Sequence, residues 1–436
     1  MLSKNKRKRL VPKGWKIINL GKEFKTSSGA TPLSSEKRFY ENGTIPWINS
    51  GELASPYIYE SSNYITQEGF DNSSTTMYPP NTVLVAMYGA TAGKASLLKI
   101  EACTNQAICA IFPNDNYCPQ FIKYSIDNLY DYLVGISSGS ARDNLSQAEL
   151  KDLELIVPQT RKEQEVLAST LSLLDKKIEL NRQINDNLEA MAKQLYDYWF
   201  VQFDFPNEEG KPYKSSGGAM LWNEKLKREI PLGWSVLSVN DIAASVRGVS
   251  YAKDDMVDSN NGVLVLRGNN IQDNRLIYDS NVAYIPSSFV SENQRIRPLD
   301  IIMTMSSGSK EHIGKSAMFQ FASEDTFGAF LTKFTAKEHC AYLLFNLFNS
   351  KYFKAKIKSI ACGTGINNLT NQTFDEIYVV MPEDELLLEF DKRQSQIFAE
   401  IGLIGKSNIE LTKQRDELLP LLMNGQASVN YHLSDD

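Results

Sequence analysis

The sequence contains an internal duplication, and this feature restricts the possible folds more than any other. Four short segments recur in the same order, at offsets that run from 219 residues for the first to 224 for the last. The pairs are PKGW at 12–15 and PLGW at 231–234, Gly-Lys at 93–94 and at 314–315, GSARDNLS at 139–146 and GTGINNLT at 363–370, and Pro158 and Pro382. Self-similarity of this kind marks a repeated structural unit. The sequence therefore predicts two copies of one unit, each about half of the chain.

Each copy begins with short β-type runs that are separated by clusters of Gly, Pro, Asn and Ser. Examples are 82–87, 107–112 and 301–305. Such runs are typical of strands joined by loops, and helical stretches are expected at 119–134 and 340–360. This pattern predicts an α+β domain in each copy.

A long helix is predicted to follow each of these domains. Apolar residues recur in alternating steps of four and three, which is the seam of a coiled coil. The first seam is Leu167, Leu171, Leu174, Ile178, Asn181, Asn185, Leu188, Ala192, Leu195 and Trp199. The second seam is Phe390, Ile397, Ile401, Ile404, Asn408, Leu411, Arg415, Leu418 and Leu422. The alternative is two amphipathic helices that each pack on their own domain, but a helix of ~40 residues is ~60 Å long and overreaches a domain of ~150 residues.

The second helix carries two features that the first helix lacks. Gly402 and Gly405 lie in its interior, where each costs ~1 kcal/mol relative to Ala. We expect these glycines to allow a close backbone approach to the partner helix. Pro420 should end or kink this helix.

Equivalent halves in the order domain, helix, domain, helix are most simply arranged about a pseudo-twofold axis. We therefore expect two similar domains, separated by two long antiparallel coiled-coil helices. The predicted boundaries are 1–157 for the first domain, 158–205 for the first helix, 206–229 for a connector, 230–381 for the second domain, 382–425 for the second helix and 426–436 for a tail.

Composition narrows the class of protein. The 436 residues carry a net charge of −6, which argues against a protein that binds polyanions through bulk charge. The five cysteines form no CxxC pair, so neither a disulfide framework nor a structural zinc site is expected. No apolar run reaches the ~18 residues of a membrane span, and no apolar segment follows the basic N-terminus as it would in a secretory signal. These absences predict a cytoplasmic protein.

The catalytic motifs that the sequence approaches fail on their spacing. Between Gly89 and Gly93 lie three residues, and Ala95 follows Lys94, whereas a phosphate-binding loop has four residues between its glycines and Ser or Thr after Lys. The sequence also has no Ser/His/Asp set and no GxSxG elbow. We therefore expect a chain that performs no chemistry itself.

The order of the motifs resembles that of the specificity subunits of type I DNA restriction–modification systems. The resemblance rests on LVPKGW at 10–15, GATP at 29–32 with IPWI at 45–48, DNLS at 143–146 leading into Pro158, and the helix ends at 195–204 and 415–425. It covers almost the whole chain and implies two target-recognition domains that read a bipartite DNA target.

The resemblance also implies partners and cofactors. Two methyltransferase subunits would dock on the two long helices, which act as a spacer between the recognition domains, and restriction (motor-nuclease) subunits would join them. The specificity subunit itself would bind no cofactor. S-adenosylmethionine would act in the methyltransferase subunits, and ATP and magnesium would act in the restriction subunits.

Candidate DNA contacts lie in or beside the predicted loops, because loop side chains on a rigid scaffold are where base reading usually occurs. The basic candidates are Lys37, Arg38, Lys94 and Arg142 in the first domain, and Arg247, Lys253, Arg267, Lys310 and Lys315 in the second. The candidates for base reading are Asn49, Ser50, Tyr88, Arg267, Asn269 and Ser307, and the shared anchors add Asn144 and Asn367. For each basic residue, a solvated surface charge is an equally good interpretation.

Two other classes of function remain open at this point. One is a stand-alone DNA methyltransferase or nuclease fusion, and the other is a coiled-coil scaffold with no DNA role. If the chain does read DNA, its loops predict an asymmetric target, because the material between the anchors differs. WINS at 47–50 corresponds to VLRG at 265–268 in the other copy, and the glycine loops differ in length.

Overall fold

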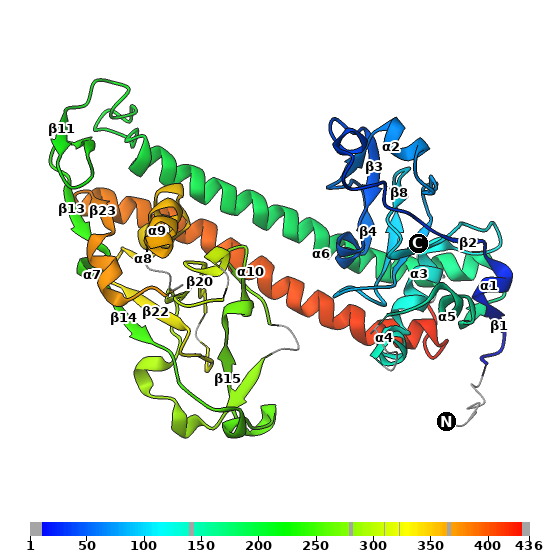
Figure 1. Ribbon diagram of the computed structural model, residues 1–436. Coiled ribbons are helices and arrows are strands. Elements are labelled where there is room, and N and C mark those ends of the chain that lie inside the picture. Colours follow the sequence, from blue (N-terminus) through cyan, green and yellow to red (C-terminus); the bar gives the residue numbers. More distant parts are fainter. Residues whose placement is uncertain are drawn as a thin grey trace, which may run out of the picture. The chain divides into compact units, whose positions relative to one another are not determined.

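The computed structural model describes residues 11–138, 144–278, 282–308, 310–321, 323–363 and 368–429. The chain divides into two compact units, and Figure 1 shows the elements of both. The first unit contains Met1–Leu180 and Ser407–Asp436, and the second contains Asn181–Lys406. Each unit therefore combines one globular domain with segments of two long helices.

The first domain is built on a five-stranded sheet in the order β2-β9-β6-β7-β4. Its strands are β2 (Thr26–Ser28), β9 (Ile108–Ile111), β6 (Val83–Ala86), β7 (Ala95–Leu98) and β4 (Tyr57–Ile58). Every residue of β6, β7 and β9 is buried, which explains why these strands read as continuous apolar runs. Alternate residues serve two cores, with Val83 and Val85 in one cluster and Leu84 and Ala86 in another.

The other elements of the first domain surround this sheet. The remaining strands are β3 (Ile45–Ile48), β5 (Tyr64–Ile65) and β8 (Cys103–Thr104) in a three-stranded sheet, and β1 (Trp15–Asn19) paired with β10 (Glu154–Pro158). The helices are α1 (Leu20–Glu23), α2 (Gln67–Asp71), α3 (Pro119–Asp127), α4 (Tyr130–Ser138) and α5 (Gln147–Lys151), with short 3-10 segments η1 (Lys37–Phe39) and η2 (Ser50–Ala54). Helix α3 packs on β6 and β7.

The second domain has a four-stranded sheet in the order β14-β22-β19-β20 and a three-stranded sheet in the order β18-β15-β21. These strands are β14 (Ala243–Arg247), β22 (Leu331–Ala336), β19 (Ile301–Thr304), β20 (Ser316–Met318), β18 (Ala283–Ile285), β15 (Val263–Leu266) and β21 (Thr326–Phe327). The two-stranded pairs are β13 (Ser235–Ser238) with β23 (Tyr378–Met381), β11 (Met220–Asn223) with β12 (Arg228–Pro231), and β16 (Ile271–Gln272) with β17 (Arg275–Leu276).

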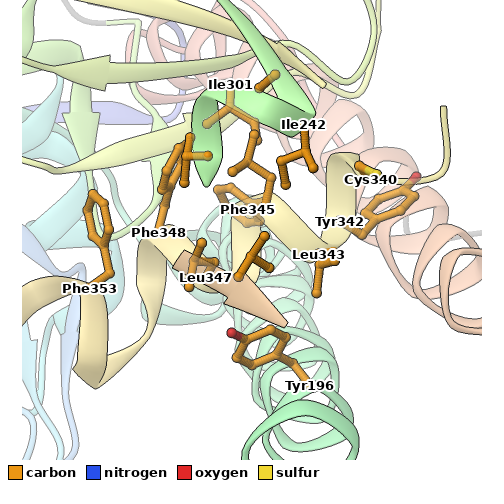
Figure 2. Packing of buried hydrophobic residues seen from close by; sticks show 14 of the residues in the cluster. Tyr196, Ile242, Ile301, Cys340, Tyr342, Leu343, Phe345, Leu347, Phe348 and Phe353 are labelled. Atoms are coloured by element: carbon orange, nitrogen blue, oxygen red, sulfur yellow. The ribbon is translucent and has the colours of Figure 1, made fainter. Parts of the chain in front are cut away.

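Short helices complete the second domain. They are α7 (Val239–Ile242), α8 (Ala341–Asn349) and α9 (Lys351–Gly363), with 3-10 segments η4 (Lys253–Asp255), η5 (Ser259–Asn261), η6 (Gly268–Asn270), η7 (Ser287–Phe289), η8 (Glu292–Gln294), η9 (Lys310–His312) and η10 (Asn371–Glu376). The core of the second unit is rich in aromatic side chains, and Figure 2 shows Phe345, Phe348 and Phe353 of α8 and α9 within it.

The two domains have equivalent topology, which confirms the predicted duplication. The order β2-β9-β6-β7 in the first domain corresponds to β14-β22-β19-β20 in the second. Each domain also has a short parallel pair outside this sheet, β3 with β8 and β15 with β21, and the first domain adds β4, which pairs parallel with β7. The PxGW anchor forms the same turn twice: the Trp15 amide donates to the Pro12 carbonyl at 3.1 Å, and the Trp234 amide donates to the Pro231 carbonyl at 3.2 Å. The intervening glycine has φ of 84° and 89° in the two copies, a conformation that favours glycine.

Two long helices, α6 (Arg161–Tyr196) and α10 (Asp384–Met423), confirm the helices predicted from the heptads. Helix α6 continues into a π-helical turn, η3 (Asp197–Val201). All residues of both predicted seams are buried or half-buried.

Segments of the two helices pair antiparallel. In the first unit, Asn408 Nδ2 donates to the Ile178 carbonyl at 3.3 Å and Arg415 contacts Asp175 at 3.4 Å, so residue numbers rise along one helix as they fall along the other. In the second unit, Gln394 Nε2 donates to the Ala192 carbonyl at 2.8 Å.

The glycines of α10 do not act as predicted. A Cβ on Gly402 would lie 3.0 Å from Phe321 Cζ, so the close approach is to a loop of the second domain and not to the partner helix. A Cβ on Gly405 would have no atom within 4 Å. Pro420 lies in the last turn of α10, which continues to Met423, so the helix does not end at the proline.

Candidate nucleic-acid interface

Four segments of the first domain meet at one set of loops. Thr91 Oγ1, in the loop between β6 and β7, donates to the Ser50 carbonyl at 2.8 Å. Asn105, after β8, donates from Nδ2 to Asn49 Oδ1 at 3.1 Å. The Leu145 amide donates to the Met87 carbonyl at 2.9 Å. These bonds bring together four of the predicted residues, Asn49, Ser50, Tyr88 and Asn144, which we call the first loop cluster.

The residues of the first loop cluster differ in how far they are engaged. The Asn49 amide donates to Glu52 Oε1 at 2.8 Å and begins η2, while the Asn49 side chain holds Asn105. The Tyr88 side chain is 37% exposed. Tyr88 is therefore the member of the cluster that offers an aromatic face and a hydroxyl to a ligand.

The described basic candidates of the first domain differ in their settings. Arg38 of η1 pairs with Glu36 at 3.0 Å and with Glu68 at 2.7 Å, and Lys37 beside it is exposed. Lys94 lines a cavity of about 270 Å³ together with Asp127 and other residues of the first unit. Arg142, which sequence placed in a shared anchor, lies outside the described residues.

The second domain brings together equivalent loops. The Gly328 amide donates to the Leu266 carbonyl at 2.9 Å, and the Leu369 amide donates to the Met305 carbonyl at 2.8 Å. A Cβ on Gly268 would lie 3.6 Å from the Thr304 side chain. We call Arg267, Asn269, Ser307 and the turn at 328–330 the second loop cluster.

The arginines of the second domain are anchored by neighbouring groups. Arg267 Nε donates to the Tyr251 hydroxyl at 2.9 Å. Arg247 Nε donates to the Ala329 carbonyl at 3.0 Å, which attaches Arg247 to the turn of the second loop cluster.

The predicted lysines of the second domain are spread more widely. Lys253 is exposed on η4, and Lys315 is half-buried before β20. The Lys315 carbonyl accepts from the Thr304 amide at 2.9 Å. Asn367 and the side chain of Lys310 lie outside the described residues.

Sequence reasoning missed Phe330, which is 67% exposed in the turn between β21 and β22. Its carbonyl accepts hydrogen bonds from the Met305 and Ser306 amides at 2.9 and 3.3 Å. In the first domain Ala107 occupies the same place, because the Met87 amide donates to its carbonyl at 2.8 Å. Comparison of the two halves offers a signal for Phe330, because the first copy has the small Ala107 where the second has this large aromatic residue.

The four cysteines whose side chains the structure describes, Cys103, Cys109, Cys118 and Cys340, are all buried. Burial raises the pKa of the Cys103 thiol to about 11 and that of the Cys109 thiol to about 12. Both thiols are therefore protonated near neutral pH, and the thiolate is the nucleophilic form. Across the described ranges, no three His, Cys, Asp or Glu side chains gather as a metal site would require. Nor is any helix there long and apolar enough to cross a membrane.

Comparison with known families decides the class of this protein. The family model described as type I restriction modification DNA specificity domain matches residues 12–190 and again 231–421. The chain belongs to this family. Each of its two DNA specificity domains includes one globular domain, one loop cluster and most of one long helix, because the matches end within α6 and α10.

Known proteins resemble the chain over nearly all of its length or over about half of it. The MjaIX specificity subunit of a type I restriction enzyme from Methanocaldococcus jannaschii is 28% identical and covers 96% of this chain and 95% of its own. The EcoKI specificity subunit of Escherichia coli is 30% identical over 45% of this chain and 41% of its own. The solved S subunit from M. genitalium has a TM-score of 0.55 at 16% identity, covering 97% of this chain and 98% of that one. This structure shows the shared fold.

Proposed function

We propose that the two loop clusters each read one half of a bipartite, asymmetric DNA target. The observation that carries this proposal is that two DNA specificity domains of one topology present different side chains from equivalent loops. The first loop cluster offers Asn49, Ser50, Tyr88 and Asn144, and the second offers Arg267, Asn269, Ser307 and Phe330. Amide, guanidinium and apolar groups recognise different base edges in the major groove, so unlike clusters favour unlike half-sites.

The basic candidates divide by their setting. Exposed Lys37 and Lys253 suit phosphate contacts, which fix register without reading sequence. Arg247 is tied to the turn of the second loop cluster and suits base reading or positioning there. We also assign phosphate contacts to Arg142 and Lys310, because both lie in or beside predicted loops of the sequence.

The predicted boundaries become functional modules in this proposal. Recognition is assigned to 1–157 and 230–381, and the helices to 158–205 and 382–425, with 206–229 as connector and 426–436 as tail. The connector contains β11 and the first two residues of β12, whose last two residues, Ile230 and Pro231, belong to the second recognition module.

Partner subunits are assigned to the outward face of α6. This face exposes large apolar side chains: Leu173 (66%) and Leu180 (56%) in the first unit, and Ile184 (38%) and Met191 (54%) in the second. Their heptad-like spacing is that of a second apolar stripe, and exposed apolar patches mark protein–protein interaction sites.

We assign this stripe to two methyltransferase subunits, with restriction (motor-nuclease) subunits joining the assembly in the cytoplasm. S-adenosylmethionine would then act in the methyltransferase subunits, and ATP and magnesium in the restriction subunits, with none held by this chain.

The experiment that tests the proposal is genomic methylation mapping in the host, with and without this chain. The expected result is one methylated motif with two unlike half-sites that disappears when the chain is deleted. A perfect palindrome would contradict asymmetric reading. Methyl transfer by the isolated chain would instead support a stand-alone methyltransferase. If the complex of this chain with methyltransferase subunits did not bind DNA, only the scaffold role would be left.

A further inference from the structure

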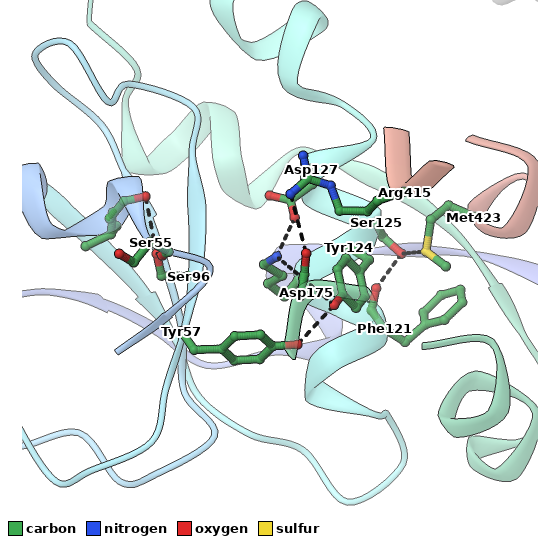
Figure 3. A network of polar contacts seen from close by, with 12 residues as sticks. Ser55, Tyr57, Ser96, Phe121, Tyr124, Ser125, Asp127, Asp175, Arg415 and Met423 are labelled. Carbon is green, nitrogen blue, oxygen red and sulfur yellow. Dashed lines mark hydrogen bonds and ion pairs between the residues drawn. The ribbon is translucent and has the colours of Figure 1, made fainter. Parts of the chain in front are cut away.

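A buried polar network in the first unit joins the two long helices. Asp175 of α6 accepts a hydrogen bond from the Tyr124 hydroxyl at 2.6 Å and lies 3.8 Å from Lys123 Nζ. Arg415 of α10 reaches the other carboxylate oxygen of Asp175 at 3.4 Å. Lys123 also pairs with Asp127 at 2.8 Å. Figure 3 shows Asp175 between Tyr124 and the Arg415 guanidinium.

The network draws its charges from both halves of the sequence, the N-terminal half before the connector 206–229 and the C-terminal half after it. Arg415 also pairs at 2.7 Å with Asp416 of its own helix, and the Asp416 side chain is 58% exposed. Lys123, Asp127 and Asp175 belong to the N-terminal half, and Arg415 comes from the C-terminal half. The side chains of Asp175 and Lys123 are 1% and 4% exposed. Removal of one partner from a buried charge pair is strongly destabilising, because the remaining charge is left uncompensated.

The second unit has an apolar cluster at the corresponding place. The helices correspond at an offset of 223, as Ile178 and Ile401 show, and α3 corresponds to α8 at an offset of 222, as Cys118 and Cys340 show. The corresponding residues are therefore Asp175 and Phe398, Ala192 and Arg415, and Lys123 and Phe345. The Phe398 ring lies 5.6 Å from that of Phe345 and 5.1 Å from that of Tyr342. Figure 2 shows Tyr342 and Phe345 in this core, which also contains Ala192.

The two places are therefore complementary in opposite ways. Where the N-terminal half supplies a buried acid, the C-terminal half supplies Arg415. Where the C-terminal half supplies the Phe398 ring, the N-terminal half supplies the small Ala192. If two N-terminal halves paired, Asp175 would face Ala192 and lose a cation. If two C-terminal halves paired, Arg415 would face Phe398 and lose its buried carboxylate.

We propose that Asp175 with Arg415, and Phe398 with Ala192, make the two halves of the chain select each other and reject a second copy of themselves. In the first unit, the surface formed by α6 and α3 is thus complementary to the C-terminal part of α10, which supplies Arg415. This pairing rule does not depend on DNA reading, so it stands or falls separately from the proposed function.

The test uses the full-length protein with a protease site inserted between Glu209 and Gly210, which are exposed. Two preparations carry different N-terminal tags and are cut, mixed, unfolded in urea and refolded together. One tag is then captured, and the recovered halves are quantified by mass spectrometry. We expect the C-terminal half to exceed the N-terminal half with the other tag at least tenfold. Equal recovery of the two would overturn the proposal.

Variants separate the charge pair from general destabilisation. Arg415→Ala should bring the recovery ratio toward one, whereas Arg415→Lys should keep the preference. Lys413→Ala is the control, because Lys413 is a cation of the same helix two residues away and is exposed. A ratio in Arg415→Ala equal to that of the control would contradict the proposal.

A second measurement needs no cut chain. In the intact protein, Asp175→Asn and Arg415→Gln are combined in a double-mutant cycle of urea unfolding. Each variant should lower the folding equilibrium constant by a measurable factor. We expect the factor for the double variant to be at least tenfold smaller than the product of the factors for the two single variants. A factor for the double variant equal to that product would show that the two residues do not select each other.

Discussion

Gly402 of α10 lies against the ring of Phe321, and a Cβ on Gly402 would be 3.0 Å from Phe321 Cζ and 3.3 Å from Gln320 Cβ. One turn further along the same helix, Lys406 Nζ lies 3.3 Å from the centre of the same ring. A glycine that weakens the helix therefore makes the recess into which a loop of the second domain fits. The helix is shaped for its own domain at this point as well as for its partner helix.

The two glycines of α10 should respond differently to alanine. Gly405→Ala should stabilise the protein by about 1 kcal/mol, because the helix gains propensity and the new methyl group meets open space. Gly402→Ala should gain clearly less, or lose stability, because the Phe321 ring has to shift. Urea unfolding midpoints measure both variants. Equal gains would show that the ring gives way at no cost.

Arg275 should fasten the hairpin of β16 and β17 to α6. Its Nε lies 2.6 Å from Glu189 Oε1, and its Nη2 lies 2.6 Å from Asp186 Oδ1. Burial raises the pKa of Glu189, and Arg275 opposes this rise. A double-mutant cycle of Arg275→Met and Glu189→Gln should give a coupling of about 1 kcal/mol, with faster hydrogen exchange in Ile271–Leu276.

The matched control for Arg275 is an exposed ion pair in the same domain. Arg297 pairs with Glu292 at 3.1 Å, with side chains 65% and 76% exposed, and such pairs contribute little. A cycle of Arg297→Met and Glu292→Gln should therefore show almost no coupling. The same coupling in both cycles would mean that the hairpin is held by other contacts.

His339 should make stability depend on pH. Its Nδ1 lies 3.0 Å from Asp391 Oδ2, and this hydrogen bond raises the pKa of His339 above its ordinary value. A raised pKa contributes stability that is complete below about 6.5, the ordinary value, and is lost as the pH rises through the raised value. The stability difference between the protein and His339→Asn should thus be largest at acidic pH and shrink toward pH 8.5.

Asparagine is the suitable substitute, because His339 has φ of 59° and Asn tolerates this left-handed conformation. Urea unfolding across the pH range measures the difference. A difference that stays constant with pH would assign the effect of the substitution to shape and not to charge.

Arg142 should behave as a phosphate contact. Arg142→Ala should weaken DNA binding by the complex about equally on all sequences and lower the salt slope by about one. Binding titrations at several salt concentrations, on target and unrelated duplexes, measure both effects. Relaxed preference at a single base pair would assign Arg142 to base reading.

Periodic features could be predicted from the sequence and contacts between distant segments could not. The heptad seam, with Ile178 and Asn408 at its centre, follows from spacing alone, because a helix places every seventh residue on one face. The contact of Gly402 with Phe321 depends on a loop 81 residues away, which no local pattern reveals. Lys94 stays a predicted DNA contact, but the cavity that it lines with Asp127 could not be predicted, because α3 brings Asp127 from another part of the domain.

Phe330 should contribute to recognition of the second half-site. Because Phe330 is 67% exposed, truncation of its ring removes few packing contacts, so Phe330→Ala should leave the unfolding midpoint almost unchanged. Its turn is fixed by the hydrogen bonds of Met305 and Ser306 to its carbonyl, and such a rigid apolar group suits the methyl group of a thymine. We expect Phe330→Ala to weaken binding to the mapped target about tenfold, or about 1.4 kcal/mol, and to weaken binding to unrelated DNA much less.

Base substitution completes the test of Phe330. Replacing each thymine of the second half-site by uracil removes one methyl group, and at one position this should weaken the unmodified protein but not Phe330→Ala. Phe289→Ala is the matched control, because Phe289 of η7 is 41% exposed in the same domain and should leave both affinities unchanged. If no uracil position distinguished the protein from Phe330→Ala, the ring would contact DNA without reading a thymine methyl group. If Phe330→Ala bound the target with full affinity, the turn at 328–330 would lie outside the interface, and the asymmetry of the second loop cluster would rest on Arg267 and Asn269.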